Sequence, residues 1–569
     1  MEKQRRRQKR TAHLMAAAVF CVFILAAGIW LLDRYTPTKR RMDPAEYFPT
    51  AGGEAAVVID GRIMEERARV FDGEICPDAG SVQNYLNPAV FYDEAEEKLI
   101  VTTPEEKLVY PVSGGLTAGG EARIAGDQAY ISLDFLGGIS DFAVHFEEDP
   151  LRAVIVTDPE YPAMDVKEDA PVRFRAGIKS PVLTDLSGGD EVRVTDVSAE
   201  GESLPDKVEG WTHVITEDGY TGYVRDRHLE NPHTGSAGIV SRRGAYTPNH
   251  LDEPVNMVFH QTTSAASNEG LTGMIREMSG VNVIAPTWFF LQGPEGGVSS
   301  IADAEYVEEA HEAGLSVWAV FNDFDGAAQD GEMTREALSS DTKRSGIVKR
   351  VTEELRSCGA DGLNLDFEYV REECAREYLQ LIREFSLELK KAGLILSVDN
   401  FVPRYTRYMD RKEQGRVVDY VVVMCYDEHT AGSSEAGSVS SVSFVREGIA
   451  DTISEVPRDK VIAAIPFYTR LWRTSGENVE STAYGMEETD HAVRAAGMEP
   501  VWDEACGQFY AEQQTGDVLL QIWIEDSRSI ALKMDAVRES GCAGVAEWKL
   551  GLETPDIWGV IQEKLNGEA

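Results

Sequence analysis

The stretch "SCGADGLNLDFEYV", residues 357–370, alternates apolar and polar residues along what reads as a buried β-strand. Successive side chains of a strand point to opposite faces. One face would carry three apolar side chains and the other an amide and two carboxylates: Leu363, Leu365 and Phe367 opposite Asn364, Asp366 and Glu368. Strands that helices cover on both faces are usually continuous in Val, Ile and Leu. We therefore expect the polar face of this strand to serve a function.

Apolar strand-like runs alternate with helical segments from Pro254 to the end of the sequence. The runs are "VNMVFHQTT", "VNVIAPTWFFL", "LSVWAVFND", "DGLNLDFEYV", "LILSVDNFV", "DYVVVMCYDEH", "KVIAAIPFYTRLW" and "GVAEWKLG". Before the fourth run, Ile347, Val351 and Leu355 recur at every fourth position, as on the buried side of a helix. Eight strands alternating with helices are typical of a (β/α)8 TIM barrel of the α/β class. We expect this barrel over residues 254–569.

In such a barrel, the C-terminal ends of the strands form the active site. Asn364, Asp366 and Glu368 would rise along the lumen wall, with Glu368 nearest the mouth. Cα atoms at positions i and i+2 lie roughly 7 Å apart, so ionisation of one carboxyl disfavours ionisation of the other. Partial burial adds to this effect. The column is therefore expected to keep one carboxyl protonated near neutral pH, as a general acid requires.

The segment "DGLNLDFE" resembles the DxxDxDxE signature of glycoside hydrolase family 18, the family of chitinases and endo-β-N-acetylglucosaminidases. Other pieces that resemble this family are "VVVMCYDEH", "IPFYTRLW", "IWIEDSRSIALKMDAV" and "AGVAEWKLG". Together they extend over nearly the whole barrel. The resemblance implies a glycosidase that needs no metal or cofactor and retains the anomeric configuration by substrate assistance, an exception to the two-carboxylate scheme.

The resemblance also implies roles for individual residues. Glu368 would protonate the glycosidic oxygen and then activate water, Asp366 would hold the acetamide N–H of an N-acetylglucosamine unit, and Tyr426 would donate to the acetamide oxygen. The other implied substrate-binding residues are Asn364, Met424, Asp427 and Trp548. Trp288 is expected to be either a second aromatic platform for sugar or a core aromatic residue.

Asn364 departs from the family pattern, because the best-known chitinases have a second Asp at this position. Its amide removes one buried charge below Asp366, so the coupled titration of the column is expected to differ. The variant "DGLNLDFE" resembles the subgroup that acts on bacterial wall and spore peptidoglycan.

The N-terminus reads as a membrane anchor. Residues 1–12 are basic, and residues 13–32 contain 19 uncharged residues from Leu14 to Leu32, about the length that crosses a bilayer. The basic flank orients the N-terminus to the cytoplasm and the rest of the chain outside. The alternative is a cleaved signal peptide, but its apolar region is usually only ~7–15 residues long. We expect a single-pass membrane protein with an extracytoplasmic catalytic domain.

Two modules are expected between the anchor and the barrel. Residues 50–160 contain two similar hairpin-like units, "AVFYDEAEEKLIVTTPE" and "AVHFEEDPLRAVIVTDPE", and loosely resemble a copper amine oxidase N-terminal-like module, without implying copper. Residues 170–230 read as short strands separated by Gly and Asp turns. They resemble a bacterial SH3-like domain, which implies attachment to the cell wall.

Charge and cysteine content exclude several classes of protein. The formal net charge of -42 argues against a nucleic-acid partner. The seven cysteines form no CxxC pair and no spacing typical of a metal site. Two hypotheses remain: a glycosidase acting on peptidoglycan, chitin or N-glycans, or a non-catalytic glycan-binding protein. The intact Glu368 favours the enzyme.

Overall fold

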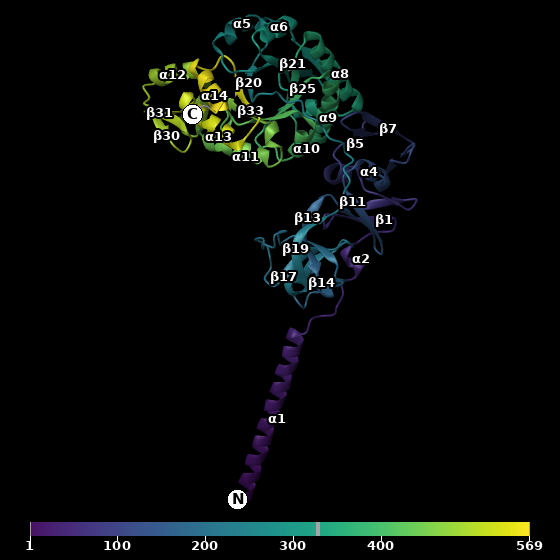
Figure 1. Ribbon diagram of the computed structural model, residues 1–569. Helices are drawn as coiled ribbons and strands as arrows, with labels where there is room; N and C mark the ends of the chain where they lie inside the picture. Colours follow the sequence, from purple (N-terminus) through teal and green to yellow (C-terminus); the bar gives the residue numbers. More distant parts are fainter. Residues whose placement is uncertain (1, 326–329, 568–569) are drawn as a thin grey trace. The chain divides into compact units, whose positions relative to one another are not determined.

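The computed structural model describes residues 2–325 and 330–567. Its contacts divide the chain into two compact units, of which the first comprises Met1–Pro88 and Val112–Arg243. The second comprises Ala89–Pro111 and Gly244–Ala569. Figure 1 shows residues 244–569 of the second unit, which are rich in helices, in teal, green and yellow.

The second unit is built on eight parallel strands that close into a barrel. They are β20 (Val255–His260), β21 (Val283–Gln292), β23 (Ser316–Asn322), β24 (Gly362–Asp366), β25 (Ile395–Phe401), β26 (Tyr420–Met424), β27 (Val461–Pro466) and β33 (Gly544–Trp548). Each strand pairs with the next in this order, and β20 pairs with both β21 and β33. The predicted eight strands and their barrel arrangement are confirmed.

Helices surround these strands (Figure 1). The principal ones are α6 (Ala304–Glu312), α7 (Gly331–Leu338), α8 (Asp341–Cys358), α9 (Ala375–Ala392), α10 (Arg411–Val417), α11 (Val442–Ile453), α13 (Ser527–Ser540) and α14 (Asp556–Leu565). Helix α8 begins where the Ser340 side chain accepts a hydrogen bond from the backbone N–H of Lys343 and ends at Gly359, which has a φ of 81°. The predicted stripe Ile347, Val351 and Leu355 is fully buried.

Two apolar layers hold the barrel together. The outer layer lies between strands and helices and contains Leu363, Leu365 and Phe367. The inner layer fills the lumen with side chains such as Phe259 and Trp318. Leu363 and Leu365 alternate with the buried Asn364 and Asp366 along β24. The opposite faces that the sequence predicts for this strand are confirmed.

A small subdomain interrupts the barrel between its seventh and eighth strands. It consists of β28 (Tyr468–Ser475), β29 (Asn478–Gly485), α12 (Met486–Ala495), β30 (Val501–Asp503), β31 (Gln508–Thr515) and β32 (Val518–Ile524). The strands form an antiparallel sheet in the order β29-β28-β32-β31-β30. The run "KVIAAIPFYTRLW", predicted as one strand, forms two, because β27 ends at Pro466 and β28 begins at Tyr468.

The segment Ala89–Pro111 packs with the barrel, although the sequence analysis placed it in the module of residues 50–160. It contains β5 (Val90–Asp93), β6 (Lys98–Thr102) and most of β7 (Lys107–Ser113). The Asp93 carboxylate accepts a hydrogen bond from the backbone N–H of Asp341 at 2.5 Å and pairs with the guanidinium of Arg344 at 3.0 Å. The side chains of both Asp93 and Arg344 are inaccessible to solvent.

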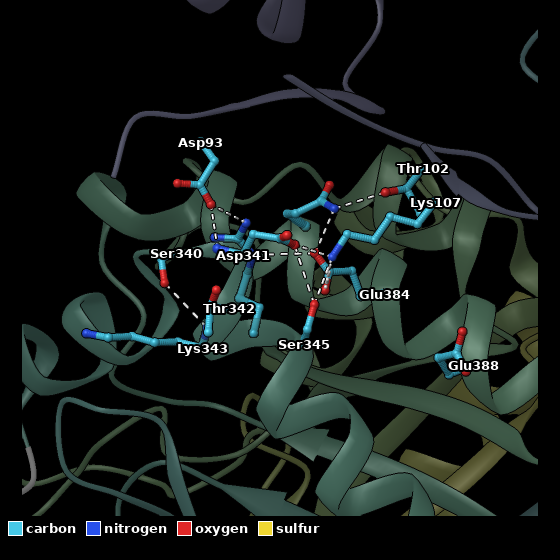
Figure 2. Close-up of polar contacts among 12 residues, drawn as sticks. Asp93, Thr102, Lys107, Ser340, Asp341, Thr342, Lys343, Ser345, Glu384 and Glu388 are labelled. Atoms are coloured by element: carbon cyan, nitrogen blue, oxygen red, sulfur yellow. Dashed lines mark hydrogen bonds and ion pairs between the residues drawn. The ribbon is translucent and has the colours of Figure 1, made fainter. Parts of the chain in front are cut away.

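Lys107 adds a second set of contacts to the same two helices. Figure 2 shows its ammonium group between Ser345 of α8 and Glu384 of α9, at 3.0 Å and 2.9 Å. It also pairs with Asp341. Gln380 donates a hydrogen bond to the Thr102 hydroxyl at 2.9 Å. These polar contacts make the segment part of the second unit's structure.

Two groups of strands in the first unit correspond to parts of the predicted modules. Residues 160–236 form a seven-stranded sheet in the order β15-β14-β18-β17-β16-β13-β19. Its strands are β13 (Glu160–Val166), β14 (Ala170–Arg173), β15 (Val182–Leu186), β16 (Glu191–Val194), β17 (Trp211–Ile215), β18 (Thr221–Arg225) and β19 (Leu229–Ser236). The second predicted hairpin forms β11 (Ala143–Glu148) and β12 (Leu151–Val156), and β12 runs parallel to β1 (Glu54–Ile59). The resemblance of residues 50–160 to a copper amine oxidase module stays a prediction.

The N-terminal helix α1 spans Glu2–Tyr35. Its segment His13–Tyr35 has a mean hydropathy of 2.6 and is long and apolar enough to cross a membrane. A signal sequence near an N-terminus has the same properties. The helix is therefore a candidate membrane span.

Candidate active site

The polar face of β24 points into the barrel and ends at its mouth. Asn364 is completely buried and Asp366 is 3% exposed. Glu368 lies two residues beyond the last strand residue and is accessible to solvent. The structure thus brings the three predicted polar residues together in the predicted vertical order.

Asp366 has a carboxyl partner that the sequence analysis missed. Asn364 pairs with Ser397 and Leu365 with Val398 along β24 and β25, so the same register sets Asp366 beside Asp399. Both carboxyls are buried, and neighbouring strands lie only about 4.8 Å apart. Burial, followed by the charge of Asp399, raises the pKa of Asp366 well above its usual value. Burial raises the pKa of Asp399 to about 8. The pair therefore holds at least one proton at neutral pH.

Asn364 positions Asp399 from below. Its amide donates hydrogen bonds to the Ser397 hydroxyl at 2.9 Å and to the Asp399 carboxyl at 2.7 Å. Because its side chain is completely buried, the prediction that Asn364 contacts substrate is wrong.

Glu368 is held by a second acid that the sequence analysis missed, Asp323 at the end of β23. The Asp323 carboxylate accepts a hydrogen bond from the backbone N–H of Glu368 at 2.8 Å and another from the Thr334 hydroxyl at 2.8 Å. Burial raises the pKa of Asp323 to about 6. Burial and the charges of Asp323, Asp427 and Asp325 raise the pKa of Glu368 to about 7. Glu368 can therefore be protonated at neutral pH and still reach a ligand in the mouth.

Tyr426 and Asp427 follow β26 at the same end of the barrel. Burial and the charge of Asp366 raise the pKa of Tyr426 well above its usual value, so its hydroxyl stays protonated as a donor. Asp427 has a φ of 57°, a strained conformation for a residue with a Cβ. It accepts a hydrogen bond from the Tyr468 hydroxyl at 2.5 Å. Met424, the last residue of β26, belongs to the lumen cluster.

The two predicted tryptophan platforms have different locations. Trp548 ends β33 and is partly exposed at the lumen, where its ring centroid lies 5.4 Å from that of Phe259. Trp288 is 0% exposed, lies in the outer core beside Tyr306 and donates its indole N–H to Asn268 at 2.9 Å. The prediction of Trp288 as a sugar platform is wrong, because the side chain faces the helix layer.

The missed acids carried a sequence signal. Asp323 ends the run "LSVWAVFND", and Asp399 lies in "LILSVDNFV", so each is an acid near the C-terminal end of an apolar strand. This is the same signal that singled out Asp366. What the sequence lacks is the register between adjacent strands, which decides that Asp399 lies next to Asp366.

Comparisons with known proteins agree with this geometry. Residues 326–553 match the sequence profile of Glycosyl hydrolases family 18, and residues 168–230 match that of the Bacterial SH3 domain. The chain carries a family 18 glycoside hydrolase domain. The predicted bacterial SH3-like domain is also confirmed.

Relatives of the family 18 domain come from bacteria, plants and animals. A cortical fragment-lytic enzyme of Bacillus subtilis is 25% identical over 260 residues, which cover 43% of this chain and 59% of that protein. A class V chitinase of Lotus japonicus is 23% identical over 278 residues, 42% of this chain and 68% of that protein. The chain spans less than two thirds of the length of the first curated relatives that it matches.

A solved structure with the same fold is the spore cortex-lytic enzyme SleL of Bacillus cereus. It is 21% identical, has a TM-score of 0.50, and the match covers 58% of this chain and 78% of that protein. At this identity, the likeness supports the barrel fold of the family 18 domain.

Asp323 gives the family 18 domain a testable pH dependence. Asp323→Asn removes a negative charge that raises the pKa of Glu368, so that pKa should fall below about 7. If Glu368 acts as the general acid, the basic limb of the kcat/KM profile should move to lower pH. Rate measurements between pH 4 and 9 check this. A basic limb at the wild-type pH would show that Asp323 only accepts the hydrogen bond from the backbone of Glu368 and does not raise its pKa.

Asn364→Asp should destabilise the family 18 domain increasingly as pH rises. A third buried carboxyl would have a folded-state pKa raised above the unfolded value of about 3.9, by burial and by Asp399. The unfolded state then releases its proton first, so stability relative to wild type falls from about pH 4 up to the raised pKa. Thermal unfolding from pH 3 to 8 measures the difference. A pH-independent difference would contradict this account.

Proposed function

We propose that this protein is a glycosidase that hydrolyses β-linked N-acetylglucosamine in peptidoglycan by a retaining, substrate-assisted mechanism. The observation that carries the proposal is the arrangement at the end of β24. An accessible Glu368 with a pKa of about 7 lies above the buried Asp366 and Asp399, whose pKa values are both raised by burial, and Tyr426 faces the same lumen. The arrangement provides a proton donor at the mouth and polar partners for an acetamide below it.

The residues divide the reaction between them. The acetamido oxygen of the sugar attacks its own anomeric carbon while Glu368 transfers its proton to the departing glycosidic oxygen. Asp366 accepts a hydrogen bond from the acetamide N–H, which becomes more acidic as the oxazolinium forms, and Tyr426 donates to the acetamide oxygen. The Glu368 carboxylate then takes a proton from water. The water oxygen attacks the anomeric carbon and opens the oxazolinium ring. The sugar nucleophile makes an enzyme carboxylate nucleophile unnecessary.

Bound sugar would rest on Trp548 in this proposal. An aromatic ring provides a large apolar surface for the C–H face of a pyranose. The partial exposure of Trp548 at the lumen supports this role. Met424 and Asp427 would line the same subsite, with Asp427 fixed by its hydrogen bond from Tyr468.

The bacterial cell wall is the substrate that the other parts of the chain favour. A bacterial SH3 domain precedes the catalytic domain, and one curated relative is named a cortical fragment-lytic enzyme. We propose that the SH3 domain binds the wall and that residues 13–32 anchor the chain to the membrane with the catalytic domain outside. Another relative is named a chitinase, so chitooligosaccharides are the alternative substrate.

Product analysis tests the proposal. The detergent-solubilised protein is incubated with peptidoglycan glycan strands, chitooligosaccharides and N-glycans, and products are identified by mass spectrometry. New N-acetylglucosamine reducing ends from wall strands, inhibition by a thiazoline analogue of the sugar, and retained anomeric configuration are expected. A covalent sugar on Asp366 or Glu368 would refute substrate assistance. Binding without cleavage of any glycan would leave only a glycan-binding protein.

The anchor has its own test. An uncleaved helix should leave the protein in the membrane fraction after a high-salt wash, with its first residues detected by mass spectrometry. A soluble product that starts near residue 30 would instead show a cleaved signal peptide.

A further inference from the structure

Lys549 is a cation at the mouth of the barrel without an acidic partner in the described residues. It directly follows Trp548, and its ammonium group donates a hydrogen bond to the neutral amide of Gln261, which follows the adjacent strand β20. Burial lowers the pKa of Lys549, and Lys549 in turn contributes to the lowered pKa of His260. The chain has 97 acidic and only 55 basic residues. Although acidic residues are in excess, this half-buried ammonium group has no carboxylate beside it to offset its loss of hydration.

Arg470 is a second such cation, on the inserted subdomain. It lies on β28 between Tyr468 and Trp472, and alternate residues of a strand share one face. On this face, Tyr468 donates to Asp427 and Trp472 donates to the backbone carbonyl of Gly437, both in the segment that follows β26. The face that carries Arg470 is thus directed toward the barrel mouth.

The guanidinium of Arg470 is also incompletely satisfied. One terminal nitrogen donates to the Ser481 hydroxyl at 3.3 Å, and its Nε is buried without a hydrogen-bond partner. No ion pair with a carboxylate forms at Arg470 within residues 2–325 and 330–567. Within the same described residues the other terminal nitrogen of this partly exposed side chain has no hydrogen-bond partner, so it is the donor that an acceptor on a ligand would satisfy.

We infer that Lys549 and Arg470 bind carboxylates on the sugars next to the reacting N-acetylglucosamine. This inference rests on the proposed function and specifies its substrate class. Chitin has no anionic group for such cations to bind. In peptidoglycan each N-acetylglucosamine is flanked on both sides by muramic acid. Muramic acid presents a free lactyl carboxylate on strands without peptides and the carboxylates of the stem peptide on intact strands.

Four substrates separate these sources. They are chitohexaose, denuded glycan strands with free lactyl carboxylates, the same strands neutralised by amidation with methylamine, and strands with intact stem peptides. The variants are Lys549→Met and Arg470→Gln. Arg473→Gln is the matched control, because Arg473 is exposed and lies on the opposite face of the same strand.

We expect wild-type kcat/KM to be about tenfold higher on a carboxylate-bearing strand than on the amidated strand, since hydrogen bonds to charged groups are worth roughly 10-fold or more in affinity. The kcat/KM of Lys549→Met and of Arg470→Gln should fall about tenfold on that strand. On chitohexaose the fall should be at least fivefold smaller. Arg473→Gln should keep the wild-type kcat/KM on both substrates. Loss on denuded strands identifies the lactyl carboxylate, and loss on peptide-bearing strands alone identifies the stem peptide.

Two results would overturn the inference. One is a wild-type enzyme that cleaves charged and amidated strands equally and whose variants keep that ratio. The other is an equal loss on all four substrates, which would assign the two cations to the fold or to the common catalytic step. A wild-type protein that cleaves none of the four would instead refute the proposed function itself.

Discussion

Replacing Glu368 with Gln is expected to lower kcat by at least about 10²–10⁴-fold, the range that general acid–base catalysis supplies. The amide keeps the shape and hydrogen-bonding capacity of Glu368 but has no proton to give to the glycosidic oxygen. Because Glu368 lies beyond the end of β24 and the core residues of that strand are unaffected, glycan binding should change little. Steady-state kinetics on the cleaved glycan, with affinity measured by calorimetry, separate the two effects.

Glu372→Gln is the matched control, because Glu372 lies on the same loop and is exposed. It should leave kcat unaltered. Azide should not rescue Glu368→Gln through a glycosyl-enzyme, because the nucleophile belongs to the substrate. Full activity of Glu368→Gln would remove the general acid from the mechanism and return the protein to the glycan-binding hypothesis.

Asp93→Ala should lower the free energy of unfolding of the catalytic unit by about 3 kcal/mol or more, the usual cost of removing one partner of a buried ion pair. Arg344 is fully buried, its guanidinium lies 4.7 Å from the ring of Phe91, and Asp93 is its nearest carboxylate at 3.0 Å. The substitution also removes the acceptor for the backbone N–H of Asp341 at the start of α8 (Figure 2). Helix α8 leads directly into β24.

Urea unfolding followed by tryptophan fluorescence measures this effect, because seven of the nine tryptophans lie after Gly244. Glu332→Ala removes an exposed ion pair with Arg335 on α7 and is the control, for which we expect no shift of the midpoint. Equal midpoints for Asp93→Ala and Glu332→Ala would show that Ala89–Pro111 contributes nothing to the stability of the barrel.

The barrel and its polar column on β24 could be predicted from the sequence because both depend on local patterns. Strand alternation alone assigns Leu363 and Leu365 to one side of β24 and Asn364 and Asp366 to the other. The order of eight apolar runs fixes the barrel, and the position of Glu368 beyond the last strand residue puts it at the mouth.

For Trp288, the alternation of residues along the strand does not predict which side of the barrel wall the side chain faces. It lies near the C-terminal half of an apolar strand, as a sugar platform would, but the pairing of β21 with β23 contains an irregularity between Thr287 and Phe289. Its side chain is buried against Tyr306, on the helix side. A one-residue change of phase turns a strand side chain to the opposite face, and the sequence does not reveal that change.

The sequence by itself determined the fold of the catalytic domain and the polar column of β24, because alternation along one strand is a local property. Only the tertiary structure decided that Asp399 lies beside Asp366 and raises its pKa, that the Asp323 carboxylate accepts a hydrogen bond from the backbone of Glu368, and that Asp93 of Ala89–Pro111 pairs with Arg344. Each of these contacts joins residues far apart in the chain. Strand register and helix packing bring them together, and the energy that fixes register comes from burial over the whole barrel rather than from any one segment.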